Sequence, residues 1–258
     1  MAPNRLLMVT LGVWAALLAA CGPCLAGQTV VLDTGEWPPY TSQTLPGGGF
    51  MTEIVASVCA EAGIEPRFEF LPWARAEAGV SSGEAFAAFP YAITPKRKEH
   101  YDFSEPMFYG LSVLMIREGN EKVKHLADGA SAADMKDIVI GAMVGGYQAH
   151  VLESAGLRVE RIPKTEQLAD MLRNGRLDGI VDDKEVLLHT VRTKFPGDHG
   201  FRIVHIQTFR KQPNGLMVSR SYPGAKALLE RFNEALRRMR ASGEYEALAV
   251  RYGLEVDP

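Results

Sequence analysis

The chain has 258 residues, a formal net charge of −3, and a hydrophobic content of 47%. A chain of this length and composition can bury a sizeable core, in one large domain or in two lobes. Its cationic residues are neither in excess nor strongly clustered, which excludes the basic surface typical of nucleic-acid-binding proteins.

The N-terminus has the pattern of an export signal. Residues 1–26 carry Arg5 and no acidic residue, then an apolar run from Leu6 to Ala20, then small residues. The apolar run is too short to span a membrane stably, and we predict cleavage after Ala26. Alternatively, the residues up to Cys21 resemble a lipoprotein box, which would lipidate that cysteine. We favour Ala26 because Cys21 would leave only a short tether before the first strand.

The cysteines and histidines predict neither redox chemistry nor a metal site. Cys21-Gly22-Pro23-Cys24 spells a thioredoxin-type motif, but it ends an apolar export signal instead of opening a helix in a folded βα unit. Cys59 stands alone in an apolar helix and is expected to be a buried small hydrophobe. The six histidines show no paired metal spacing, and we expect no metal and no cofactor.

Strand and helix patterns alternate through the first half of the chain. The predicted elements are a strand at Thr29–Leu32, a helix at Phe50–Ala62, a strand at Pro66–Leu71, a helix at Trp73–Val80 and a strand at Ala85–Phe89. A short bend is expected at Pro90-Tyr91-Ala92. Such alternation is typical of α/β architecture with a parallel sheet.

The segment that follows this strand contains a candidate ligand-binding arginine. Thr94 and Pro95 have the pattern of a helix N-cap followed by proline at the first helical position. Arg97 would then lie in the first turn of a helix, just past the carboxyl end of a strand, where open α/β sheets bind ligands. Its guanidinium can hold a carboxylate through two parallel hydrogen bonds. The alternative is a capped surface helix with a solvated arginine.

Thr94, Arg97 and the run Asp102-Phe103-Ser104 with Pro106 resemble the family 3 bacterial solute-binding proteins, the soluble receptors of polar amino-acid ABC importers. The resemblance extends from Thr29 to about Leu254. It implies a two-lobed, type II periplasmic-binding-protein fold with a ligand cleft between the lobes. It also implies a periplasmic monomer that delivers a small carboxylate-bearing ligand to an ABC permease, with Arg97 on the ligand carboxylate.

The second half repeats the structural plan of the first. The predicted elements are strands at Leu111–Ile116, Ile138–Ala142, Leu157–Ile162 and Leu177–Val181, with helices at Tyr147–Ser154, Thr165–Arg173 and Lys184–Val191. A chain break at Gln212–Gly215 then precedes helices at Pro223–Ala241 and Tyr245–Tyr252. The resulting division is 1–26 for the signal, 27–110 for lobe 1, 111–213 for lobe 2, and 214–258 for the return to lobe 1.

Asp182 and Asp183 end a predicted strand of the second lobe. One of them could be a helix N-cap. In the family, an aspartate just after a Leu-Asp-x-x-x-x strand binds the ligand ammonium, and aligning Leu177-Asp178 gives that role to Asp183. A cation from one lobe and an anion from the other would together hold a zwitterion, and neither charge would be buried without a partner.

Aromatic residues surround the predicted site. Trp37, in a loop after the first strand, and Trp73, at the start of a helix, match apolar wall positions of the family, although both could belong to the core. The second-lobe position that often reads Gly-Thr-Thr in the family here reads Gly145-Gly146-Tyr147, whose backbone amides could bind an anion.

The first lobe departs from the family as well. Before the threonine, where small or hydroxyl residues are usual, this chain has the run Phe89, Pro90, Tyr91 and Ala92, and Pro90 has no N–H to donate. These departures indicate a ligand that is flatter, larger or less hydrogen-bonded than a simple polar amino acid.

Two other functions fit the same scaffold. Periplasmic cyclohexadienyl dehydratases resemble this family and would need a proton donor, for which Glu185 and Glu36 are candidates. The chain could also be a binding accessory of a periplasmic oxidoreductase or sensor. Because no residue stands out as a proton donor, we favour a binding protein over an enzyme.

Overall fold

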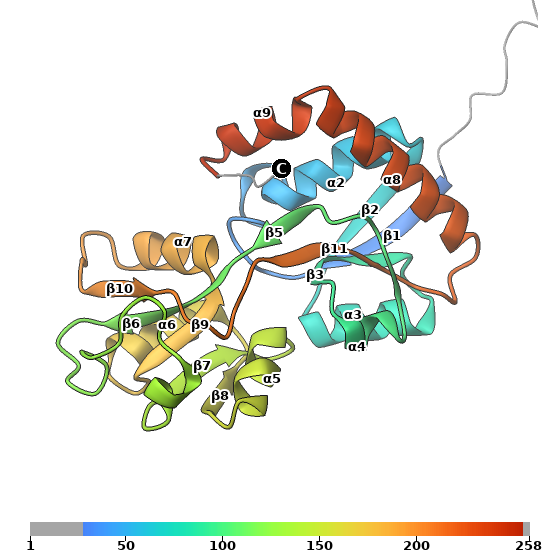
Figure 1. Cartoon of the computed structure of the whole chain (residues 1–258). Helices are drawn as coiled ribbons and strands as arrows, with labels where there is room; N and C mark the ends of the chain where they lie inside the picture. Colours follow the sequence, from blue (N-terminus) through green and yellow to red (C-terminus); the bar gives the residue numbers. More distant parts are fainter. Residues whose placement is uncertain (1–27, 255–258) are drawn as a thin grey trace, which may run out of the picture.

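The computed structural model describes residues 28–254, which form two α/β lobes, each built around its own sheet (Figure 1). The fold class is therefore the one predicted from the sequence. The predicted export signal, its cleavage point and Cys21 lie outside the described residues.

The first lobe is built on a six-stranded sheet in the described residues, in the order β2-β1-β3-β11-β4, with β5 paired to β11. Its strands are β1 (Gln28–Thr34), β2 (Ile64–Phe70), β3 (Ala87–Ala92), β4 (Asp102–Phe103), β5 (Phe108–Gly110) and β11 (Gln212–Val218). β1 runs parallel to β2 and β3, whereas β11 is antiparallel to β3. Every residue of β3 is buried, as expected for a strand covered on both faces.

Helices cover both faces of this sheet (Figure 1). On one side lie α2 (Phe50–Glu61), α8 (Ala225–Ala241) and α9 (Glu244–Arg251), and on the other lie α3 (Trp73–Ser82) and α4 (Pro95–Lys98). A short 3-10 helix, η1 (Pro46–Gly48), precedes α2. Cys59 is buried in α2 and free, as the sequence predicted.

The second lobe contains a five-stranded sheet among the described residues, in the order β10-β6-β9-β7-β8. Its strands are β6 (Ser112–Arg117), β7 (Val139–Met143), β8 (Arg158–Ile162), β9 (Gly179–Asp183) and β10 (Phe201–Val204). The helices of this lobe are α5 (Tyr147–Ser154), α6 (Thr165–Arg173) and α7 (Lys184–Lys194), together with the 3-10 helix η2 (Ala132–Met135). β7 is parallel to β8 and β9, while β6 is antiparallel to β9.

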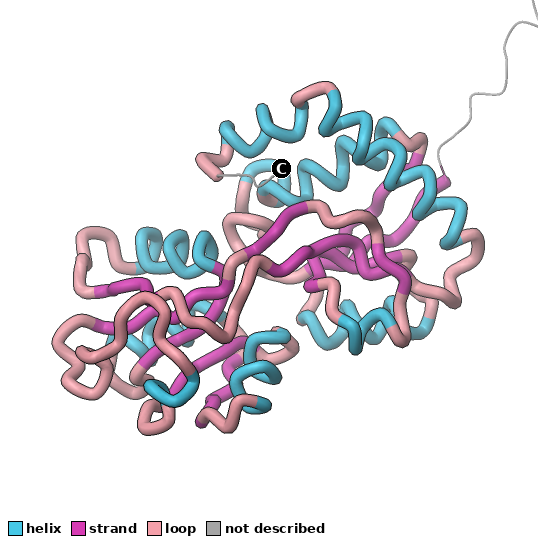
Figure 2. Tube along the Cα trace, in the orientation of Figure 1, coloured by secondary structure: helices cyan, strands magenta, loops and turns pink. Residues whose placement is uncertain are grey.

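The chain crosses between the lobes twice (Figure 2). It leaves the first sheet with β5 and enters the second with β6, so that only Leu111 separates the two strands. It returns through β11, whose first residues pair with β5. The two crossing segments are thus hydrogen-bonded neighbours, an arrangement suited to a hinge.

Two predicted breaks are instead strand. Tyr91 and Ala92 continue β3 and pair with Gly215 and Asn214, and Gln212–Asn214 begin β11 and pair with β5. The register shifts where Phe89 and Pro90 of β3 lie opposite Leu216 alone. Proline has no N–H to donate to the ladder, and a bulge is one of the places where a sheet tolerates it.

We expected Thr165 to cap the helix that it begins, and the structure gives a different cap. The N-cap of α6 is Lys164, and Thr165 is the first helical residue. The Thr165 hydroxyl is therefore free of a capping role, and it donates a hydrogen bond to Asp182.

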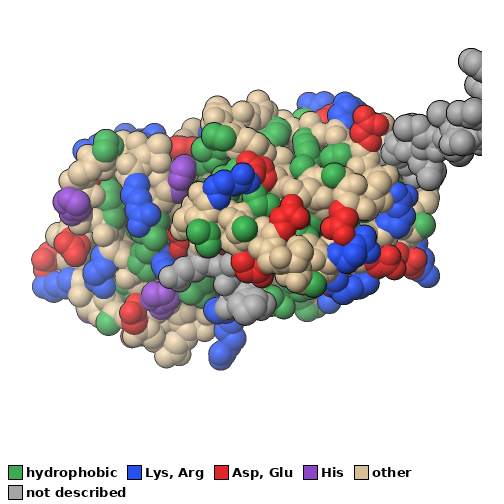
Figure 3. Space-filling model, turned by 90° about the horizontal axis from the view of Figure 1, so that it is seen from above, with side chains coloured by type: hydrophobic (Ala, Val, Ile, Leu, Met, Phe, Trp, Pro, Cys, Tyr) green, Lys and Arg blue, Asp and Glu red, His purple; other side chains and the backbone are tan. Residues whose placement is uncertain are grey.

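The described surface carries charges of both signs. On the face seen in Figure 3, acidic and basic side chains are interspersed and do not gather into one large area of a single sign. Within residues 28–254, the helices are all too short or too polar to cross a membrane.

Candidate ligand-binding site

A cavity lies between the two lobes. Its described lining residues are Trp37, Trp73, Pro90, Tyr91, Ala92, Arg97 and Asn214 from the first lobe, and Met143, Gly145, Gly146, Tyr147, Gln148 and Asp182 from the second. Seven of the eight residues predicted to bind ligand line this cavity, and Asp183 does not. Their role in binding remains a prediction.

Arg97 reaches the cavity from α4. The Thr94 side chain accepts a hydrogen bond from the Arg97 amide at 3.3 Å, and Pro95 occupies the first helical position, as predicted. The guanidinium donates to the carbonyl of Ala92 at 3.3 Å and lies 4.7 Å from the centre of the Tyr91 ring. The cap at Thr94 thus fixes the turn, and the Tyr91 ring stabilises the positive charge of Arg97.

Arg97 also contacts the opposite lobe. Its Nη2 donates to the carbonyl of Gly145 at 3.2 Å, and its side chain is only 15% exposed. Two of its N–H groups are thereby used, out of the five that a guanidinium offers. Nη2 also lies 4.0 Å from a carboxylate oxygen of Glu77, and a carboxylate inside the cavity would use the N–H groups that these contacts leave.

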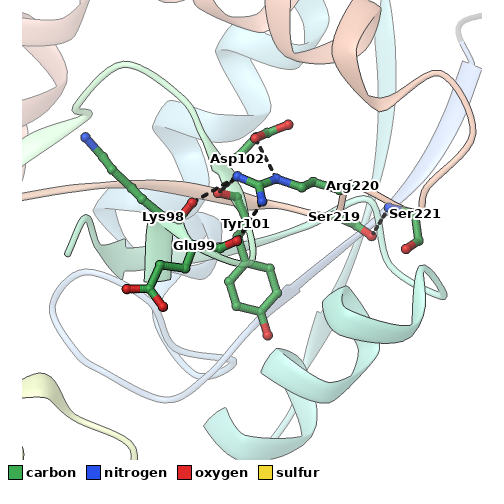
Figure 4. Close-up of polar contacts among 7 residues, drawn as sticks. All are labelled: Lys98, Glu99, Tyr101, Asp102, Ser219, Arg220 and Ser221. Carbon is green, nitrogen blue, oxygen red and sulfur yellow. Dashed lines mark hydrogen bonds and ion pairs between the residues drawn. The ribbon is translucent and has the colours of Figure 1, made fainter. Parts of the chain in front are cut away.

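Arg220 clamps the end of the turn that carries Arg97 (Figure 4). It donates to the carbonyls of Lys98 (2.9 Å), Glu99 (2.8 Å) and Tyr101 (3.1 Å). Its Nε also donates to the Asp102 carboxylate at 2.9 Å. Because α4 has only four residues, these bonds to its C-terminal end replace the contacts that a longer helix would make within itself.

Asp182 is the acidic residue of the cavity, and it lies on β9. Its Oδ1 accepts hydrogen bonds from Trp37 Nε1 at 3.1 Å and from the Asp183 amide at 2.8 Å. Its Oδ2 accepts from the Thr165 hydroxyl at 3.1 Å. Burial raises the pKa of the Asp182 carboxyl to about 6, although all three hydrogen bonds favour the ionised form.

Asp183, to which the family pattern assigned the ammonium, lies outside the cavity lining. Its carboxylate caps α7 by accepting from the Glu185 amide at 3.0 Å. It also accepts from the Leu111 amide at 3.0 Å and from the Tyr40 hydroxyl at 2.9 Å. Burial raises its pKa to about 7. Asp183 therefore holds together α7, the first crossing segment and the loop after β1, and the acid at the cavity is its neighbour Asp182.

Trp37 and Trp73 form part of the first-lobe wall. Trp37 is 9% exposed and its ring centre lies 4.8 Å from that of Tyr40. Trp73 packs against the backbone of Gly35, where an added Cβ would lie 2.5 Å from Trp73 Cε2. Trp73 also meets the Tyr91 ring edge-on at 5.5 Å, and its carbonyl accepts from the Tyr91 hydroxyl at 2.8 Å.

The second-lobe wall begins at the N-terminus of α5. The Gly146 amide donates to the Met143 carbonyl at 3.2 Å, which removes it from the predicted anion site. Tyr147 is the first residue of α5, so its amide has no partner within the helix. The Tyr147 hydroxyl is 2.8 Å from Ser112 Oγ, to which Gln148 Nε2 also donates at 3.2 Å.

Sequence reasoning did not select Met143, Gln148 or Asn214 for the site. Met143 ends β7, a strand end that could have identified it. Gln148 follows the glycine turn by two residues, and no local pattern distinguishes it from a surface glutamine. Asn214 lies in a stretch expected to be a chain break, and it reaches the cavity because that stretch is strand β11.

The candidate proton donors of the enzyme hypothesis lie away from the cavity lining. Glu36 accepts a hydrogen bond from the Gln43 amide at 2.9 Å, and it borders a separate hollow next to Trp73. Glu185 lies 3.8 Å from the Lys184 ammonium. Among residues 28–254, no three His, Cys, Asp or Glu side chains group closely enough to hold a metal ion.

Two α/β lobes joined by paired crossing strands, with charged and aromatic residues of both lobes around one cavity, define a type II solute-binding architecture. The chain belongs to the bacterial extracellular solute-binding proteins, family 3, whose sequence profile matches residues 29–255. The family consists of extracellular proteins that bind solutes, and this chain is a solute-binding protein.

Individual relatives agree with this assignment. The chain is 25% identical to a probable histidine-binding protein of Neisseria gonorrhoeae over 86% of this chain and 81% of the relative. It is also 25% identical to the L-cystine-binding protein TcyJ of Escherichia coli, over 88% and 82%. The arginine-, lysine-, histidine-binding protein ArtJ of Geobacillus stearothermophilus superposes with a TM-score of 0.75 at 20% identity, over 89% of this chain and 97% of that structure.

Proposed function

We propose that this protein is an exported, periplasmic, monomeric receptor that holds a small zwitterionic carboxylate between its lobes and delivers it to an ABC permease in the inner membrane. The observation that supports this is the position of Arg97 and Asp182, which line one cavity from opposite lobes. Two relatives are named for binding histidine and L-cystine, which supports an amino-acid-like ligand.

The charges of the site suit a ligand with one carboxylate and one cationic nitrogen. Arg97 keeps unused donors that can make two parallel bonds to a carboxylate. Asp182 is 2% exposed, and burial of an ionised carboxylate without a nearby cation costs several kcal/mol. A zwitterion satisfies both groups at once.

Lobe closure follows from the contacts that only a closed cleft makes. Trp37 to Asp182, Tyr40 to Asp183 and Arg97 to Gly145 are hydrogen bonds between the lobes. A ligand that touches Arg97 and Asp182 together binds the closed form better than the open form. Ligand therefore shifts the equilibrium toward closure by the difference between its two affinities.

A binding role is favoured over the dehydratase alternative by the placement of the candidate acids. Glu36 and Glu185 do not line the cavity, so neither would reach a ligand carboxylate held by Arg97. Incubation with prephenate or arogenate, followed by an absorbance scan, tests the enzyme directly. If the wild type converts either acid and Arg97→Gln does not, the protein is an enzyme and the receptor assignment is wrong.

The binding experiment is isothermal titration of the mature chain against amino acids and small organic acids. Arg97→Gln should weaken binding at least about thirtyfold, because loss of one partner from a buried charge pair costs about 2–5 kcal/mol. Lys98→Gln, on the same helix but outside the cavity lining, is the matched control and should change Kd less than about threefold. If Arg97→Gln binds as well as the wild type, the carboxylate clamp is refuted.

Export has its own test. The intact mass of protein recovered from the periplasm distinguishes cleavage after Ala26 from lipidation at Cys21. Recovery of the full-length chain from the cytoplasm would contradict both.

A further inference from the structure

Four aromatic rings line the cavity, and they come from both lobes. Trp37, Trp73 and Tyr91 belong to the first lobe and Tyr147 to the second. The cavity is largely apolar apart from its charged and amide groups, and none of the described lining residues is Ser or Thr. The Tyr91 ring already supports one cation, because the Arg97 guanidinium carbon lies 4.7 Å from its centre.

The carboxylate of Asp182 has little capacity left for new hydrogen bonds. Three donors already reach it, from Trp37, Thr165 and the Asp183 amide. A carboxylate has about four acceptor positions, so one position remains for a ligand. A primary ammonium carries three N–H donors, and each donor left without an acceptor in a closed cleft would be destabilising.

A methylated ammonium avoids this difficulty. It keeps the positive charge that Asp182 requires, and a fully methylated nitrogen has no N–H to satisfy. Its methyl groups can pack against aromatic rings, whose faces attract cations, and cages of aromatic side chains are a known means of binding quaternary ammonium groups. The shortage of hydroxyl groups, which leaves few side-chain acceptors for a primary ammonium, is then no disadvantage.

We propose that the ligand is a betaine, a small carboxylate whose cationic nitrogen is methylated. This proposal rests on the proposed function, and it specifies the chemical class of the ligand. Arg97 holds the carboxylate, and the rings of Trp37, Trp73 and Tyr147 surround the methylated nitrogen. Asp182, which lines the same cavity and is hydrogen-bonded to Trp37, balances its charge.

The test is a methylation series at constant carboxylate. Glycine, N-methylglycine, N,N-dimethylglycine and N,N,N-trimethylglycine are titrated into the mature chain, with proline and N,N-dimethylproline as a second pair. Affinity should rise with methylation, by at least tenfold from glycine to trimethylglycine. The uncharged isostere 3,3-dimethylbutyrate should bind at least tenfold more weakly than trimethylglycine, because it has the same shape without the positive charge.

Variants of Trp73 separate ring chemistry from apolar volume. Trp73→Leu should weaken trimethylglycine binding about 3- to 30-fold, the range expected for a cation on an aromatic face. Trp73→Phe should restore part of the loss. Tyr222→Leu is the matched control, since it removes a ring that contacts Phe86 away from the cavity lining.

Each outcome is decisive for the betaine proposal. A flat or inverted methylation series overturns it, as does 3,3-dimethylbutyrate binding equally well or an absence of binding by every methylated probe. In each of these cases, Arg97-dependent binding of an unmethylated amino acid would leave the proposed function intact. Among the binding experiments, the result that refutes the proposed function is that no carboxylate of either panel binds in an Arg97-dependent way.

Discussion

Replacement of Arg220 by glutamine should weaken ligand binding, although Arg220 lies outside the cavity lining. Its guanidinium makes three hydrogen bonds to backbone carbonyls and one to Asp102, all at the end of the turn that carries Arg97. Among the side chains drawn in Figure 4, only Arg220 bonds to the carbonyls at the C-terminal end of α4.

The size of the effect follows from these contacts. A net hydrogen bond contributes about 0.5–1.5 kcal/mol, and an exposed ion pair about 0.2–1 kcal/mol. The Arg220 side chain is 45% exposed, so the lower part of each range applies and the four contacts together contribute roughly 2 kcal/mol. If the turn then leaves its binding position in most molecules, only the remaining fraction can bind ligand. The apparent Kd equals the intrinsic Kd divided by that fraction. We expect Kd to rise about 3- to 30-fold.

The assay is isothermal titration with any ligand found for the wild type, together with a thermal melt. Arg231→Gln is the matched control, because Arg231 donates in the same way to the carbonyls of Ala62 and Gly63 at the end of α2, far along the chain from Arg97. Both variants should lose thermal stability, and only Arg220→Gln should lose affinity. A lower melting temperature with unchanged Kd for Arg220→Gln would show that the clamp serves stability alone.

Three further predictions concern buried acids. Asp33→Asn should stabilise the protein above pH 6: Asp33 is 3% exposed, its Oδ1 has no partner among the described residues, and burial raises its pKa to about 6. The pKa of Asp33 in the folded protein exceeds the unfolded value of 3.8. The wild type therefore loses stability as the pH rises from 3.8 to about 6. The gain should be roughly 1–3 kcal/mol, a few degrees in the melt, and should vanish below about pH 4; a pH-independent gain would contradict the reasoning. Affinity for a cationic ligand should fall by up to about tenfold from pH 7 to pH 5, the full drop applying to a ligand-free cleft that is closed, where Asp182 has a pKa of about 6 and must be ionised to bind the ligand; Asp182→Asn should flatten this profile in titrations at each pH. Tyr40→Phe removes a donor to Asp183 and should destabilise the fold by about 1–3 kcal/mol in denaturant unfolding, whereas equal midpoints would mean that this bond is dispensable.

Local signals in the sequence were sufficient to predict the turn that carries Arg97. Thr94 and Pro95 define the start of α4 by capping and by fixed backbone geometry, and both effects act within three residues. The glycine turn before Tyr147 was also predictable from local sequence, because it depends on the backbone of the glycines themselves. Gly145 has a positive φ of 81°, a conformation that residues with a side chain rarely adopt, and α5 begins two residues later.

The choice between Asp182 and Asp183 could not be made from the sequence. Successive residues of a strand point to opposite faces, so two acids at one strand end have different surroundings, and the pattern alone does not say which faces the cleft. The deciding contacts come from distant residues, Tyr40 and Leu111 for Asp183, and Trp37 for Asp182. The misread stretches Pro90–Ala92 and Gln212–Gly215 have the same origin, since both become strand by pairing with residues distant in the sequence. Tyr91 and Ala92 pair with Gly215 and Asn214, and Gln212–Asn214 also pair with β5.

The two adjacent acids connect lobe closure to protonation and to ligand charge. Each accepts a hydrogen bond from the first lobe, Asp182 from Trp37 and Asp183 from Tyr40, and each has a pKa raised chiefly by burial. Opening the cleft would hydrate both carboxylates and return their pKa values toward the ordinary range, so a closed cleft without a cation binds protons more tightly than an open one. A cationic ligand beside Asp182 stabilises the ionised form instead. Proton and ligand therefore compete for the same buried carboxylate, and acidification should release the ligand even while it favours closure.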